Sequence, residues 1–125
     1  MKIIEAITTT DNLKFNAFPQ DLKIGWLSRL DHMVKTQIID THEGGEDTNF
    51  IGYDSETDLY NTELLIPAPF DEVYLRWIEA QIDYYNGEIN KYNISMSMFN
   101  TEYAAFENWY RRNHMPRSHG SRFIF

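Results

Sequence analysis

The sequence has 125 residues, a formal net charge of −8, and 42% hydrophobic and 15% aromatic residues. This length suits a single domain with a modest core, and the apolar fraction excludes an intrinsically disordered chain. The absence of cysteine excludes disulfides, thiolate metal sites and a cysteine nucleophile. No stretch approaches the ~20 apolar residues that a membrane-spanning helix needs, so we expect no membrane partner.

Charge is distributed unevenly along the chain. Residues 1–110 contain seven Lys and Arg and nineteen Asp and Glu, whereas residues 111–125 contain four Arg and no acid. Because phosphate binding needs clustered Lys and Arg, the acidic body should repel nucleic acid. The basic C-terminal segment alone is suited to an acidic partner.

The N-terminal half predicts two helices. A short helix over 2–8 places Ile3, Ile4 and Ile7 on one face, and the polar run 8–12 predicts a loop. A longer helix over 19–41 begins at Pro19, because proline suits the first helical position. Its apolar side chains follow a 3.6-residue period: Leu22, Trp26, Leu27, Leu30, Val34 and Ile38.

A long acidic loop follows, over residues 40–69. Its first part, residues 40–63, carries eight Asp and Glu and no Lys or Arg, and its apolar residues are sparse. Loops of this length within a small domain are usually functional or become ordered against a partner. We therefore expect the 40–63 segment to contact another chain, with Phe50, Ile51 and Tyr53 as its apolar contact residues.

The second half predicts a helical hairpin. A helix over 70–86 is followed by Asn86-Gly87, which is typical of a helix end, and by a last helix over 88–113. An alternative is one continuous helix through Gly87, because glycine costs a helix only about 1 kcal/mol. The last helix has apolar residues at alternating spacings of three and four: Ile89, Tyr92, Met96, Phe99, Tyr103, Phe106 and Tyr110.

These elements predict an all-α fold, a small helical bundle with a long C-terminal helical hairpin, an acidic loop and an extended C-terminal arm. The bundle domain would cover residues 1–116 and the arm residues 117–125. The arm ends in three large apolar residues, which are unusual beyond a polar linker. We expect it to dock on a neighbouring chain, for example by adding a strand to a sheet, through Arg117, Arg122, Phe123, Ile124 and Phe125.

Catalytic and metal-binding patterns are weak throughout. The four histidines lack the spacing of a metal site, and no glycine-rich phosphate loop or nucleophile turn is present. Asp54, Glu56 and Asp58 alternate as in a calcium loop, but the glycine and the final glutamate of that motif are missing. We therefore predict no catalytic, cofactor-binding or metal-binding residues, no cofactor, and a protein that is not an enzyme.

The second half also resembles a known family. The residues that carry the resemblance are a proline-led helix start, the helix after it, an Asn-Gly-Glu turn, and regular aromatics on the last helix: 64–71, 73–83, 86–88, 92–93, 98–100 and 114–116. Together they resemble head–tail adaptor, or head-completion, proteins of long-tailed bacteriophages and prophages. The resemblance covers roughly residues 63–116 and the first half only loosely.

The resemblance implies a structural virion protein of the particle neck, assembled in the host cytoplasm. Such a subunit would form a ring with other copies, typically twelvefold, between the portal protein and the next neck or tail-completion protein. DNA would pass through the ring without specific binding, which suits an acidic body. The adaptor hypothesis predicts that the 40–63 loop and the 117–125 arm contact other chains. It would be contradicted if both folded back onto their own domain.

Two other hypotheses remain open at this point. An acidic phage-encoded inhibitor that mimics DNA would place its acids on one face at phosphate-like spacing and would bind a host nucleic-acid enzyme. A small enzyme of unrecognised type would need His32, Asp40 or His42 to converge in a pocket.

Overall fold

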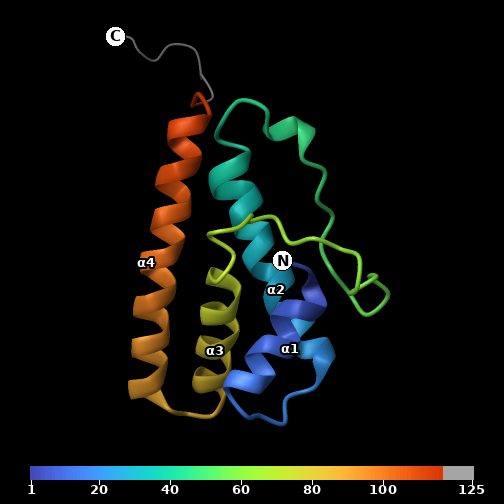
Figure 1. Ribbon diagram of the computed structural model, residues 1–125, viewed down its shortest axis with the longest axis vertical. Coiled ribbons are helices and arrows are strands. Elements are labelled where there is room, and N and C mark those ends of the chain that lie inside the picture. Colours follow the sequence, from blue (N-terminus) through green and yellow to red (C-terminus); the bar gives the residue numbers. More distant parts are fainter. Residues whose placement is uncertain (117–125) are drawn as a thin grey trace.

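Within residues 1–116, which the computed structural model describes, the chain forms a bundle of four α-helices and no strand (Figure 1). The helices are α1 (Ile3–Leu13), α2 (Gln20–Val34), α3 (Val73–Tyr85) and α4 (Ile89–Asn113). A π-helical turn (Lys35–Ile39) continues α2, and a short 3-10 helix (Gly45–Asp47) lies in the long loop. The predicted all-α helical bundle is therefore confirmed, whereas the predicted arm over 117–125 lies outside the described residues.

Helix α1 is longer than predicted, because it continues through the segment expected to be a loop. Thr10 is fully buried, and its hydroxyl donates a hydrogen bond to the Ala6 carbonyl at 2.8 Å. This bond satisfies the threonine side chain inside the helix. Burial against the bundle therefore outweighs the poor helix propensity of residues 8–12.

Helix α2 supplies the centre of the core. Trp26, Leu27, Leu30, Val34 and Ile38 are all buried, as the periodicity predicts. Leu22 is the exception, with 40% of its surface exposed. The adjacent Lys23 is buried instead, and its ammonium group pairs with Asp11 at 2.7 Å. This ion pair ties the start of α2 to the end of α1.

Helices α3 and α4 form the predicted antiparallel hairpin (Figure 1). Gly87 takes a φ of +74°, a conformation that glycine adopts without the steric cost of a Cβ, so one continuous helix is ruled out. Between the helices, Asp83 accepts hydrogen bonds from Lys14 at 2.6 Å and from Ser95 at 2.9 Å. The aromatic seam of α4 is buried at Phe99, Phe106 and Tyr110, whereas Ile89 near the turn is 56% exposed.

The middle of the long loop, residues 49–60, and α4 lie at opposite edges of the molecule, with α2 and α3 between them (Figure 1). Helix α4 therefore packs on the bundle with one face and leaves the other face outward. The end of α4 is joined to the end of the π-helical turn by an isolated bridge between His42 and Pro116. Glu43 also donates a backbone hydrogen bond to Met115 at 2.8 Å.

Candidate assembly surfaces

Asp31 on α2 is a fully buried carboxylate that holds the long loop in place. It accepts hydrogen bonds from the Tyr53 hydroxyl at 2.5 Å, from the Tyr74 hydroxyl at 2.6 Å and from the Leu65 amide at 3.1 Å. The Tyr74 hydroxyl in turn accepts one from the Ile66 amide at 2.7 Å. Three segments of the chain, the loop, α2 and α3, thus meet at one acidic side chain.

This environment changes the acidity of all three side chains. Burial raises the pKa of Asp31, although the hydrogen bonds from both tyrosines act in the opposite direction. Burial, followed by the Asp31 charge, raises the pKa of Tyr53 and of Tyr74. Both phenols therefore remain neutral donors at physiological pH.

The three loop residues predicted to contact a partner differ in exposure: two pack on their own subunit and one faces solvent. Tyr53 is fixed to Asp31, and its amide donates a hydrogen bond to Ser28 at 3.0 Å. Phe50 packs edge-on against His32 and Tyr53, with ring centroids 4.8 and 5.1 Å away. Only Ile51 is left outward, with 89% of its surface exposed. Phe50 and Tyr53 therefore pack on their own subunit, and the expectation that the 40–63 segment contacts another chain stays a prediction.

The acids of the loop remain at the surface. All eight Asp and Glu side chains of residues 40–63 belong to exposed residues: Asp40, Glu43, Glu46, Asp47, Asp54, Glu56, Asp58 and Glu63. Asp54 and Asp58 accept hydrogen bonds from the amides two residues further on, those of Glu56 and Tyr60. Among residues 1–116, no three His, Asp or Glu side chains are grouped so that they could hold a metal ion.

The residues that a catalytic site would need have separate structural partners. Asp40 is paired with Lys35, and His32 packs against Phe50. His42 is buried just beyond the π-helical turn that continues α2, where its ring contacts the Ile38 carbonyl at 2.7 Å and the Tyr110 ring at 5.2 Å. These contacts assign the three side chains to the packing of the loop and of the α4 end.

The outward face of α4 is an unusual surface for an acidic protein. Between residues 94 and 108, every exposed residue is uncharged: Ile94, Ser97, Met98, Asn100, Thr101, Ala104, Ala105 and Asn108. This face, which we call the neutral α4 face, is about 21 Å long. Ile94 and Met98 are 63% and 43% exposed, and a small cleft of about 180 Å³ adjoins Ala105. Solvent faces of helices usually carry charged residues, so the composition indicates a contact surface.

Sequence reasoning missed this face, because the aromatic seam dominates the periodicity of α4. A signal was present. Ile94, Met98, Thr101 and Ala105 follow spacings of four, three and four, and they form a second ridge out of phase with the seam. The charged residues within 94–108 are Glu102 and Glu107, and both are partly buried.

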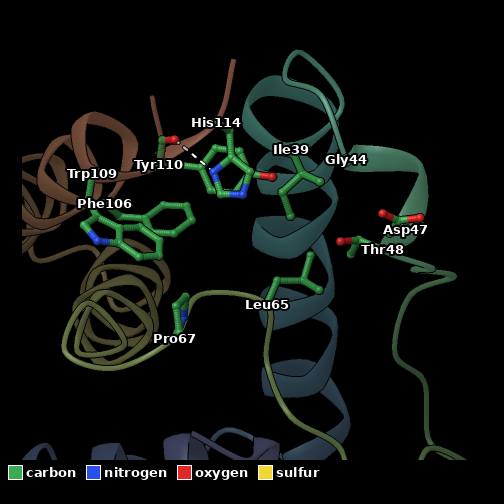
Figure 2. Close-up of a pocket in the computed structure, with 10 residues that line it drawn as sticks. All are labelled: Ile39, Gly44, Asp47, Thr48, Leu65, Pro67, Phe106, Trp109, Tyr110 and His114. Atoms are coloured by element: carbon green, nitrogen blue, oxygen red, sulfur yellow. Dashed lines mark hydrogen bonds between the residues drawn. The ribbon is translucent and has the colours of Figure 1, made fainter. Parts of the chain in front are cut away.

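A second candidate surface is a pocket at the C-terminal end of α4, with a volume of about 340 Å³ (Figure 2). Its aromatic side consists of Phe106, Trp109, Tyr110 and His114, and the His114 ring stacks on Tyr110 with centroids 3.8 Å apart. The opposite side is formed by the end of α2 and by the loop: Ile39, Gly44, Asp47, Thr48, Leu65 and Pro67.

Comparison with known proteins identifies no relative: no family model, no curated protein and no solved structure matches the chain. Within residues 1–116, no helix combines the length and apolar character needed to cross a membrane. The geometry of the surfaces is therefore the basis for a functional proposal.

Proposed function

We propose that the chain is a structural assembly subunit, a head–tail adaptor that joins a portal to the neck or tail of a long-tailed bacteriophage. The observation that carries the proposal is the neutral α4 face. Contact surfaces between proteins are depleted in Lys, Glu and Asp at their centres, and this face excludes charge over four helical turns of a protein with net charge −8.

The position of the neutral α4 face supports contacts between copies of the chain. Helix α4 forms one edge of the molecule, with α3 on its inner side only (Figure 1). The later part of the loop, residues 49–60, lies at the opposite edge and carries the exposed Asp54, Glu56 and Asp58. In a ring, each subunit contacts the next heterologously, and one edge meets a different edge of its neighbour. An edge whose exposed residues between 94 and 108 are uncharged limits like-charge repulsion between acidic subunits in such contacts.

Because Phe50 and Tyr53 pack on their own subunit, the loop offers different residues to a partner than the sequence predicted. The loop no longer supplies flexible apolar residues to a partner, and Ile51 with the surrounding carboxylates forms a fixed acidic surface. In the adaptor proposal, an acidic surface suits a channel along which DNA moves without binding.

The test is to mix the full chain with the portal protein of the same genome and to measure the mass of the complex by native mass spectrometry. The proposal predicts a complex that contains several copies of the chain per portal ring. A chain that stays monomeric in the presence of assembled portal would contradict it.

A second candidate function is an acidic inhibitor that mimics DNA, and the eight exposed carboxylates of residues 40–63 favour it. Such a protein would be captured by a host nucleic-acid enzyme and displaced by added DNA. Binding that persists when the loop carboxylates are replaced by amides would contradict this alternative.

A further inference from the structure

We propose that the aromatic pocket at the end of α4 receives the apolar C-terminal segment, Phe123, Ile124 and Phe125, of a second copy of the chain. This inference rests on the proposed function, because it names the receiving site for one contact between subunits. The pocket of Figure 2 is at the small end of the size range of binding pockets, which suits one or two side chains.

The chemistry of the pocket matches that of the segment. Its floor is apolar and aromatic: Phe106 and Tyr110 are buried, and Trp109 packs against Phe70 with centroids 5.4 Å apart. Aromatic rings pair favourably edge to face or offset, so the walls suit phenylalanine side chains.

The charges around the pocket also complement those of the C-terminal segment. Asp47 lines the rim, and Glu43 and Glu46 are exposed in the same turn of the chain. Residues 117–125 contain Arg117 and Arg122 and no acid. Arg122 directly precedes the apolar residues, so an acidic rim around an apolar floor complements this order of residues.

The path of the chain at the end of α4 favours docking of the C-terminal segment in the pocket of a neighbouring copy over docking in its own pocket. Helix α4 passes the pocket between Phe106 and His114, and the chain reaches its rim at Pro116, which is bridged to His42. The six residues 117–122 span at most about 20 Å. To place Phe123 in the pocket of its own subunit, these six residues would have to turn back toward α4, whereas the pocket of a neighbouring copy imposes no such turn. Contacts of this kind are heterologous, as ring assembly requires.

Cysteine cross-linking tests the inference cleanly, because residues 1–125 contain no cysteine. One variant carries Thr48→Cys at the pocket and another carries Ser121→Cys in the segment. The two, distinguished by isotope labelling, are mixed with glutathione disulfide. A disulfide between differently labelled chains requires contact between copies. We expect its yield to be at least fivefold above that of a control pair in which Asn12→Cys, at an exposed residue in the last turn of α1, replaces Thr48→Cys.

Replacing Phe123 and Phe125 by serine in the Ser121→Cys chain should reduce the yield to the control level, because the apolar anchor is lost. The inference is overturned if the mixed yield equals the control yield. It is also overturned if a Thr48→Cys, Ser121→Cys double variant closes an internal disulfide while the mixture gives none, since the segment would then occupy its own pocket.

The result separates this inference from the proposed function. Complexes with portal that form without the cross-link would leave the adaptor proposal standing and reject the pocket contact. A cross-link between copies with no portal complex would support the pocket contact and reject the adaptor role.

Discussion

Tyr53 joins the long loop to α2 through its hydroxyl group, which donates to Asp31, and through its amide, which donates to Ser28. Tyr53→Phe removes this hydrogen bond to a charged acceptor and should lower the free energy of unfolding by about 1.5 kcal/mol. Hydrogen exchange at the amides of residues 50–57 should become faster, because the loop loses its anchor. Tyr60→Phe, at a tyrosine that is 69% exposed, provides the matched control. Equal exchange in both variants would show that the hydroxyl does not hold the loop.

Asp31 should make stability depend on pH in an unusual direction. Burial raises its pKa in the folded state. A raised pKa stabilises the fold below the unfolded-state pKa, and this contribution is lost as the pH rises through the folded-state pKa. The free energy of unfolding of the native chain should therefore fall relative to that of Asp31→Asn as the pH rises from about 4, near the ordinary carboxyl pKa.

Urea denaturation of both proteins at several pH values measures this difference. Asp21→Asn, an exposed residue on the same helix, controls for the loss of one negative charge. If the advantage of the native chain over Asp31→Asn grows with pH, the hydrogen bonds rather than burial determine the pKa of Asp31.

At the scale of elements, Gly45 and Gly25 should respond in opposite ways to replacement by alanine. A Cβ at Gly45 would lie 2.4 Å from the Ile39 carbonyl oxygen, so the 3-10 helix sits directly on the end of the π-helical turn. A Cβ at Gly25, inside α2, would meet no atom within 4 Å. Gly45→Ala should therefore destabilise the fold by about 2 kcal/mol, and Gly25→Ala should stabilise it by roughly 0.5–1 kcal/mol. Thermal unfolding of the two variants checks both signs, and a stable Gly45→Ala protein would contradict the close approach.

The elements that sequence predicted well are those in which periodicity and local signals agree. Pro19, Asn86 and Gly87 mark helix boundaries through backbone chemistry, and the buried residues of α2 and α3 follow the 3.6-residue period. The continuation of α1 through Thr10 and the π-helical turn could not be predicted, because they depend on packing between distant segments. For the same reason, no sequence pattern indicated that Tyr53 and Leu65 would meet Asp31.

The candidate surfaces were predicted only in part. The acids of residues 40–63 are exposed, as a run without apolar periodicity indicates. Phe50 and Tyr53 were assigned to a partner because aromatics are enriched in interfaces, but the same property suits them to their own core. The neutral α4 face depends on which side of the helix meets α3, and this is decided by tertiary packing.

At the scale of the whole molecule, the bundle presents two different edges. The later part of the acidic loop, residues 49–60, occupies one edge, and the neutral α4 face occupies the other (Figure 1). The pocket that ends α4 lies at one end of the molecule, where the chain leaves the described residues (Figure 2). This distribution gives each copy chemically distinct surfaces, which heterologous assembly requires.

The most direct test of the assembly proposal is the mass of the portal mixture when the neutral α4 face is charged. Ile94→Glu with Met98→Glu adds two buried charges to any contact made there, whereas Leu13→Glu places one charge in the last turn of α1, outside the neutral α4 face, at a leucine that is 61% exposed. With circular dichroism confirming that both variants fold, native mass spectrometry should show multi-copy portal complexes for the native chain and Leu13→Glu and free monomer for the double variant. Complexes of equal mass and abundance for all three proteins would contradict the account.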